Sequence, residues 1–337
     1  MPVFSHGFPF DPAHGRSLDQ LLALPAPTAP ADFDAFWTER YEAARRVVTA
    51  PAVGPLEEER DGARIFGVSF TSVGGLRLGG WLVLPADGPA EHGFVVGHGY
   101  GGRQDPGTDV PLPLPRSAAV LPCVRGLGAR SRRPGIPGEA GEHVLYGIDS
   151  RDTYVLGDCV ADLWCAASAL LELVPELVSE PAGGAGDRPG ARLGYVGESL
   201  GGGLGALALP WDDRMGCAQL TVPAFGDRPL GLTLPSVGSG RAVRAYHHDH
   251  PGVMDVLPYF DAATAASRIR VPVLVAAALF DPSVPPPGQF AVYNALAGPR
   301  ELYTLSAGHF AHPDEARETA ELDAARRRFF GERLRRT

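Results

Sequence analysis

Short apolar runs that alternate with helical stretches constrain the fold of this 337-residue chain more than any other feature. From residue 93 onward, each run has the length of one buried strand. The runs are GFVVGHG, AAVLPCVRG, RLGYVGE, RVPVLVAAALFD and ELYTLSAGH. Buried strands separated by helices are typical of a mostly parallel sheet with helices on both faces. The sequence therefore predicts an α/β fold, and its 45% hydrophobic residues are ample for a core.

Residues 151–174 contain the clearest predicted helix, because apolar side chains recur there with the helical period. Upstream, residues 64–86 alternate apolar and other residues around a Gly-Gly turn, which predicts an antiparallel hairpin. The glycine-rich residues 179–190 are predicted to form a loop.

The N-terminal part of the chain is rich in proline and is predicted to contain one helix. Asp32 is a suitable N-cap for it, and Phe33 and Trp37 fall on one side. We expect one domain over residues 1–337, with residues 1–55 as an N-terminal helical extension packed on the body.

The sequence GYVGESLGGG, residues 194–203, places one serine among five glycines where a strand is predicted to end. Residues 197–201 fit G-x-S-x-G, the nucleophile elbow of α/β-hydrolases. A serine on a sharp strand-to-helix turn needs neighbours without bulky side chains, and the helix N-terminus directs free N–H groups at the reacting oxygen. Ser199 is therefore the candidate nucleophile.

A serine hydroxyl needs a base to take its proton, and the base needs an acid to orient it. In this fold the chain order is serine, acid, histidine. After Ser199, one predicted strand ends at Asp281 and another at His309. Both side chains should lie at the carboxyl edge of the sheet, where open α/β folds bind ligands.

Other histidines and acids compete for these roles. The rival histidines are His247, His248, His250 and His312, and the rival acids are Asp249, Asp255 and Asp314. None of these acids follows a predicted strand. The cluster HHDH at residues 247–250 could suggest a metal site, but without a partner motif we interpret it as a solvated loop.

An oxyanion hole in this fold uses the N–H after the nucleophile and one from a loop after an earlier strand. The first is the backbone N–H of Leu200. The second is predicted to be that of Tyr100, in the tight turn HGYGG at residues 98–102.

Composition excludes several classes of function. A net charge of −9 argues against a nucleic-acid partner. All 30 basic residues are arginine, which excludes a lysine nucleophile or base. The four cysteines have no C-x-x-C spacing, and we expect buried, reduced thiols, no metal and no cofactor. No secretory signal or membrane-spanning run is visible, so we expect a cytoplasmic protein without a membrane partner.

Taken together, the motifs resemble the acetyl xylan esterase / cephalosporin-C deacetylase family of α/β-hydrolases. The similarity runs almost end to end, through PADFDAFW, HGYGGR, GIDSRDTY, GESLGGG, YFDAATAASRIRVPVLV and FDPSVPPPGQFAVYNALAGPRELY. It implies a serine esterase that removes acetyl groups from small substrates. By position, Ser199, Asp281 and His309 match the triad of the family, and Tyr100 and Leu200 match its oxyanion donors. The resemblance also implies a ring-like homo-oligomer, a hexamer.

The chain departs from the usual family pattern at four positions, where it has Cys123, Leu127, Leu200 and Phe310 in place of more polar residues. We infer a less hydrophilic site that prefers simpler or more apolar acetyl esters. Arg125 and Gly126 are candidates for substrate binding or site support. For Arg125 a structural anchor is favoured, because its planar fork suits loop carbonyls or a carboxylate.

Residues 223–260 separate the elbow from the acid strand and are predicted to overhang the site. Two alternatives stay open. One is a general short-chain carboxylesterase, lactonase or small-amide hydrolase with the same triad. The other is a catalytically silent hydrolase fold that serves as a binding module.

Overall fold

A nine-stranded sheet organises the molecule, with the strand order β1-β2-β3-β5-β4-β6-β7-β8-β9. The structure is a computed structural model that describes residues 4–177 and 193–334. The strands are β1 (Ala52–Arg60), β2 (Ala63–Thr71), β3 (Arg77–Pro85), β4 (His92–Gly97), β5 (Ser117–Pro122), β6 (Leu193–Glu198), β7 (Met215–Thr221), β8 (Val273–Ala278) and β9 (Arg300–Leu305). Neighbours from β5 to β9 pair in parallel, and β1, β2, β3 and β5 pair antiparallel. The predicted mostly parallel sheet is confirmed.

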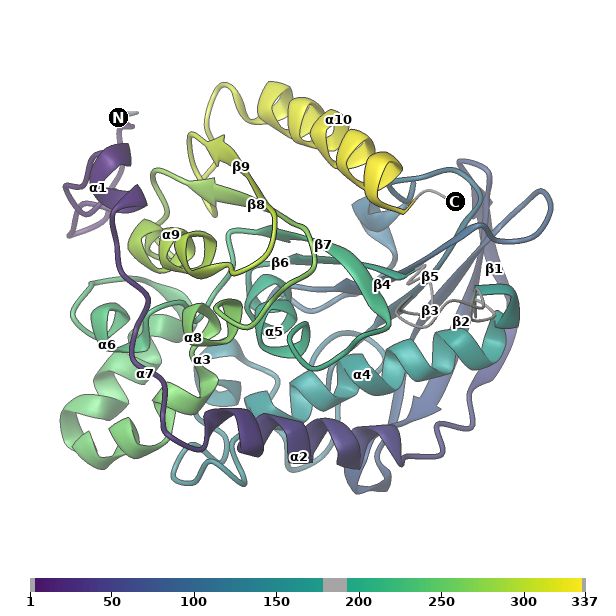
Figure 1. Cartoon of the computed structure of the whole chain (residues 1–337), viewed down its shortest axis with the longest axis horizontal. Helices are drawn as coiled ribbons and strands as arrows, with labels where there is room; N and C mark the ends of the chain where they lie inside the picture. The colour runs from purple at the N-terminus through teal and green to yellow at the C-terminus, as the bar shows by residue number, and fades with distance from the viewer. Residues whose placement is uncertain (1–3, 178–192, 335–337) are drawn as a thin grey trace, which may run out of the picture.

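Helices cover both faces of this sheet (Figure 1). They are α1 (Leu18–Leu22), α2 (Phe33–Arg45), α3 (Ala140–His143), α4 (Val155–Leu173), α5 (Leu200–Ala208), α6 (Arg228–Gly231), α7 (Gly238–Asp249), α8 (Ala262–Ala266), α9 (Pro286–Ala295) and α10 (Glu315–Arg333). Figure 1 shows α10 on one side of the sheet and α2, α4 and α5 on the other. The predicted helix within residues 151–174 is α4.

The predicted hairpin of residues 64–86 is confirmed by β2 and β3. These strands pair antiparallel from Thr71 and Arg77 beside the turn to Ala63 and Pro85 at the far end. Two strands, β1 and β7, were not predicted. The predicted loop at residues 179–190 lies outside the described residues.

One connection differs from the predicted alternation of strands and helices. Between β4 and β5 the fully described chain forms a single 3-10 turn, Gly107–Asp109, and no α-helix. The segment contains Pro106, Pro111, Pro113 and Pro115. Because proline lacks an N–H and obstructs the preceding turn, this spacing prevents a helix.

The N-terminal segment packs on the body through α1 and α2, which contact α9 and α4. Phe33 and Trp37 on α2 are fully buried, as predicted. Asp32 occupies the N-cap position, but its side chain makes no capping hydrogen bond, so that part of the prediction is wrong. The carboxylate instead accepts from Arg151 at 2.7 Å and from the hydroxyl of Tyr259. The charged guanidinium is a stronger donor than a helix N–H and captures it.

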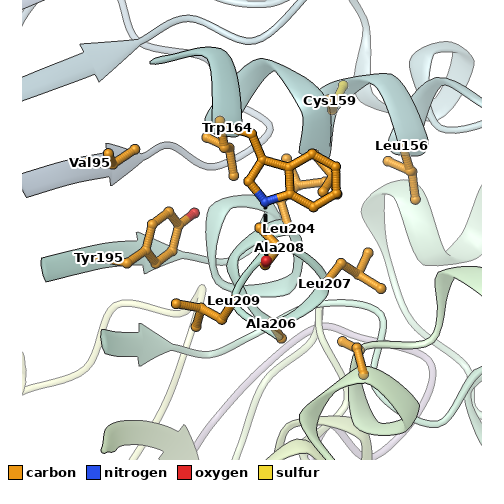
Figure 2. Close-up of a cluster of buried hydrophobic side chains, with 14 of the residues drawn as sticks. Val95, Leu156, Cys159, Trp164, Tyr195, Leu204, Ala206, Leu207, Ala208 and Leu209 are labelled. Atoms are coloured by element: carbon orange, nitrogen blue, oxygen red, sulfur yellow. Dashed lines mark hydrogen bonds between the residues drawn. The ribbon is translucent and has the colours of Figure 1, made fainter. Parts of the chain in front are cut away.

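The larger part of the core lies between α4, α5 and the sheet (Figure 2). Its largest member is the fully buried Trp164, whose indole N–H donates to the carbonyl of Ala208 at 3.1 Å. Tyr195 on β6 donates its hydroxyl to the carbonyl of Gly201 at 2.6 Å. Both bonds hold α5, which follows the predicted nucleophile, against its neighbours.

All four cysteines are described, buried and free of disulfide bonds. Burial raises the pKa of each thiol, as expected for inert core residues. In the part of the chain that the structure describes, no helix is both long enough and apolar enough to cross a membrane.

Candidate active site

Ser199 stands between β6 and α5 in a backbone conformation that residues with a side chain rarely adopt. Its φ is 55° and its ψ is −115°. The conformation is held from both sides, because its N–H donates to the carbonyl of Thr221 at 2.9 Å. Its carbonyl accepts from the N–H groups of Gly203 and Ala224, each at 3.0 Å. The strain is thus fixed by neighbouring elements, as expected for a nucleophile elbow.

The glycines around Ser199 allow a close approach of backbone. A Cβ atom on Gly197 would lie 2.5 Å from the carbonyl oxygen of Gly201. A Cβ atom on Gly201 would lie 2.7 Å from the carbonyl carbon of Gly97. The turn therefore requires residues without side chains at these positions, which confirms the reason proposed for the glycine-rich motif.

The three residues predicted to form the triad lie in one hydrogen-bonded chain. The hydroxyl of Ser199 donates to Nε2 of His309 across 2.9 Å. Nδ1 of His309 donates to Oδ2 of Asp281, also at 2.9 Å. The side chain of His309 is 25% exposed and that of Asp281 is fully buried. The base is thus reachable from solvent, and its orienting acid is not.

The carboxylate of Asp281 is saturated with hydrogen bonds. Its Oδ1 accepts from the N–H groups of Ser283 at 2.8 Å and Val284 at 2.9 Å. Its Oδ2 accepts from Nε2 of Gln289 on α9 at 3.0 Å, besides His309. Since every donor stabilises the ionised form, Asp281 stays an anion and fixes the tautomer of His309 with its proton on Nδ1.

The pKa of His309 reflects opposing effects. Burial lowers it, but the hydrogen bond to Asp281 and the negative charges of Asp281 and Glu198 together raise it above its ordinary value. Glu198 precedes the nucleophile and lines a polar cavity together with His309. Water can reach its carboxyl from that cavity, yet protein surrounds it closely, and burial raises its pKa. In the described residues this carboxylate has no hydrogen-bond partner.

Two backbone N–H groups are available for an oxyanion. Leu200 is the first residue of α5, so its N–H has no acceptor within the helix. The carbonyl of Gly99 accepts from Nδ1 of His98 at 2.7 Å and from the N–H of Gly102 at 3.0 Å. Because a trans peptide points its N–H opposite to its carbonyl, these bonds set the direction of the Tyr100 N–H. Neither N–H donates to an acceptor among the described residues.

His98 holds this loop as a neutral imidazole. Its Nε2 accepts from the N–H of Val124 at 3.1 Å, which leaves the proton on Nδ1. Burial lowers the pKa of His98 to about 3, so the ring stays uncharged at neutral pH. It is therefore a positioning residue for Tyr100.

Arg125 is a buried anchor rather than part of an open surface. Its Nη2 and Nε donate to the two oxygens of Asp162 at 2.7 and 3.0 Å, and Nη1 donates to Asp158 at 2.5 Å. Gly126 adopts a φ of +81°, and a Cβ there would lie 2.5 Å from Ile136. Both residues shape the loop after β5, and neither contacts a triad side chain in the described structure.

Three of the departures from the family pattern belong to the core. Leu127 is 1% exposed, and Cys123 and Leu200 are fully buried. Phe310 joins an aromatic cluster in which its ring lies 5.0 Å from Phe280 and 5.6 Å from Phe4. The expected change in polarity at the site therefore does not come from Cys123, Leu127 or Leu200 directly.

None of the rival residues joins the triad in the described structure. Residues 247–249 end helix α7, with His250 as its C-cap, so the interpretation of HHDH as a loop is wrong; His248, Asp249 and His250 are exposed. Asp255 and Asp314 are also exposed. His312 is buried beside Glu318, with 3.7 Å between Nε2 and Oε2. Within the described residues, no group of three or more histidines, cysteines and carboxylates is placed to hold a metal ion.

Sequence reasoning missed three residues of the site. Glu198 occupies a variable position of G-x-S-x-G, so the motif carried no signal for it. Gln289 lies eight residues after Asp281 in the helix that follows the acid strand, and a glutamine so close to that strand end was the available signal. His98 was inside the quoted turn, but only the backbone of that turn was assigned a role.

The model of the acetyl xylan esterase family matches residues 16–319 of the chain. Among solved structures, the acetyl xylan esterase from Paenibacillus sp. R4 is similar with 25% identity and a TM-score of 0.75. That match covers 92% of this chain and 99% of the other. Acetyl xylan esterase 1 from Thermoanaerobacterium sp. JW/SL YS485 is similar with 20% identity and a TM-score of 0.75, covering 94% of this chain and 99% of the other.

A more distant similarity concerns the fold alone. A cold-adapted esterase from an Arctic intertidal metagenomic library is 18% identical with a TM-score of 0.54, covering 84% of this chain and all of the other. The extent of the family match, together with the site geometry, identifies the chain. It belongs to the acetyl xylan esterase family of α/β-hydrolases and is a carboxylic ester hydrolase.

Proposed function

We propose that the protein is a serine deacetylase that acts on small acetylated substrates such as acetylated xylo-oligosaccharides or cephalosporin C. The observation that carries the proposal is the continuous hydrogen-bonded chain from Ser199 through His309 to Asp281. The membership of the chain in the acetyl xylan esterase family supports acetate as the acyl group.

The reaction proceeds by two acyl transfers. Ser199 attacks the acetyl carbonyl while Nε2 of His309 takes the hydroxyl proton, and Asp281 stabilises the imidazolium that forms. The N–H groups of Tyr100 and Leu200 bind the oxyanion. His309 then protonates the leaving alcohol, and water releases acetate from Ser199 by the same steps.

The test is a panel of acetylated substrates with acetate release as the readout, on the wild type and on Ser199→Ala. We expect Ser199→Ala to fold normally and to lose about a thousandfold or more in kcat, because the nucleophile is absent. Retained turnover by this variant would overturn the mechanism. No labelling of the wild type by a serine-reactive phosphonate would favour the silent binding module.

A general short-chain carboxylesterase is the second candidate, and one observation favours it. The pocket beside the site is lined mainly by apolar side chains, which do not select for a sugar. Rates for acetyl, butyryl and hexanoyl esters of one alcohol separate the two candidates. A sharp fall beyond acetyl supports the deacetylase, and similar rates support the general esterase.

Assembly and location belong to the same proposal. The family resemblance supports a homo-oligomer, a hexamer, which light scattering coupled to gel filtration would test. The four unpaired cysteines are typical of a reducing compartment and support a cytoplasmic location.

A further inference from the structure

A pocket with an apolar lining opens beside the catalytic residues. It has a volume of about 650 Å³, counting the space at its mouth. Its apolar walls include Val144, Leu232, Val243, Val284 and Pro285. Most of the lining comes from the segment between β7 and α8 and from the loop after Asp281, at the carboxyl edge of the sheet.

The walls of this pocket are bonded directly to the nucleophile and to the acid. Ala224, a lining residue, donates its N–H to the carbonyl of Ser199 at 3.0 Å. Val284, on the other wall, donates its N–H to Oδ1 of Asp281 at 2.9 Å. A substrate bound at Ser199 therefore has this pocket as its neighbour.

Arg228 is the charged residue of the lining, and its charge has no partner. The residue is 8% exposed. Its Nε donates to the carbonyl of Phe260 at 3.1 Å, and its guanidinium lies 4.4 Å from the centre of the Phe225 ring. Nη2 is buried without a hydrogen-bond partner. Among the described residues, no carboxylate lies within ion-pair distance of this guanidinium.

The other buried arginines are paired, which makes this one exceptional. Arg103 donates to Asp109 at 2.8 Å, and Arg125 donates to Asp162 at 2.7 Å. The acid near Arg228 is Asp261, whose oxygens accept from the backbone N–H groups of Arg228 and Thr264 instead. Burying an unpaired cation is costly, so such a residue is usually kept for a ligand.

Two hydroxyl groups accompany this cation. Those of Tyr100 and Tyr154 are buried, and neither has a hydrogen-bond partner in the described structure. Both tyrosines lie close enough to Arg228 for its charge to oppose the rise that burial causes in their pKa. Burial keeps both phenols protonated, so they remain donors. The wall thus combines a guanidinium and neutral hydroxyls, the groups that bind a carboxylate.

We propose that Arg228 binds a carboxylate on the alcohol half of the ester, so that the enzyme prefers anionic acetyl esters. This inference rests on the proposed function, because a substrate with an acetyl acyl group leaves only its alcohol half to fill the pocket. A guanidinium suits the planar, two-oxygen geometry of a carboxylate. The apolar walls suit a hydrocarbon or aromatic body between the ester and the acid.

The test compares kcat/KM for 4-acetoxybenzoate and its neutral methyl ester. We expect the wild type to prefer the carboxylate by about tenfold or more, as for one charged hydrogen bond. In Arg228→Gln that preference disappears through a higher KM, while turnover of the methyl ester is unchanged. Equal rates for the two esters in the wild type, or an undiminished preference in the variant, would overturn the inference.

Arg241→Gln is the matched control. This arginine is exposed on α7, outside the lining, so its loss removes the same charge without touching the pocket. The variant should keep the preference, and its loss there would mean a general field effect instead. A gain seen with p-nitrophenyl hemisuccinate over p-nitrophenyl acetate, and not with 4-acetoxybenzoate, would place the carboxylate on the acyl half and contradict the proposal.

Two further measurements do not depend on turnover or on the folding of Arg228→Gln. In the wild type, benzoate should inhibit hydrolysis of the methyl ester at least tenfold more strongly than benzamide, and equal inhibition would overturn the inference. Calorimetric binding of 4-acetoxybenzoate to Ser199→Ala should weaken about tenfold when Arg228→Gln is added. If the wild type hydrolyses neither ester, the proposed function fails, and this binding measurement still tests Arg228.

Discussion

At the scale of single residues, the site concentrates backbone strain and charge on the two residues that exchange a proton. Ser199 has a φ of 55° and His309 a φ of 49°, both in the left-handed region. Such conformations persist only where the surroundings determine them. Here the bonds of Ser199 to neighbouring backbone and the fully bonded carboxylate of Asp281 supply that support.

The pH dependence of the enzyme should respond to Glu198. His309 must be neutral to accept a proton, so activity is lost as pH falls through its pKa. The charge of Glu198 contributes to raising that pKa. Glu198→Gln removes the charge, lowers the pKa of His309, and should move the acid limb of kcat/KM to lower pH by about 0.5–1 unit. A pH–rate profile measures this shift.

Glu315→Gln is the control for that profile. Glu315 lines the same cavity, but it is exposed and does not contribute to the pKa of His309. Its removal should leave the acid limb in place. An unchanged limb in Glu198→Gln, or a shift to higher pH, would contradict the role given to Glu198.

At the scale of elements, Arg125 joins the loop after β5 to helix α4. Asp162 on α4 is fully buried, and it also accepts from the hydroxyl of Ser72 at 2.5 Å and from the N–H of Arg125 at 3.0 Å. Arg125→Met leaves this carboxylate without its cation and should lower the free energy of unfolding by about 3–5 kcal/mol. Urea denaturation measures the loss.

Arg317→Met provides the comparison. Its side chain is 56% exposed and pairs with Glu321 at 2.9 Å, so its removal should cost no more than about 1 kcal/mol. If Arg125 bound substrate instead, the folded Arg125→Met protein would show a raised KM with little loss of stability.

Sequence patterns predicted the elements with a strong local signal and missed those without one. The strand and helix around Ser199 follow from glycine spacing and apolar runs. β7 escaped notice because the buried Gln219 interrupts its apolar pattern, and β1 because it is an exposed edge strand rich in acidic residues. The bonds of His98 and Gln289 connect distant segments, and no local pattern encodes them.

At the scale of the whole molecule, the two faces of the sheet are covered unequally. Helices α4, α5, α8 and α9 form a contacting series on one face. On the other face the proline-rich link between β4 and β5 forms no α-helix, and α10 packs there against β7 and β8. Cavities remain on this face beside α10, one of them next to His309.

Because α10 provides so much of that cover, its buried aromatic residues should be critical for stability. Phe330 is fully buried, and its ring meets that of Phe94 on β4 edge to face at 5.0 Å. Phe330→Ala should lower the free energy of unfolding by about 3–5 kcal/mol, with the urea midpoint falling at an unchanged slope. Arg327→Ala, on the exposed side of the same helix, should change it by no more than about 0.5 kcal/mol. A loss below about 1 kcal/mol in Phe330→Ala would mean that the sheet is stable without α10, and the unequal cover would then have no consequence for the fold.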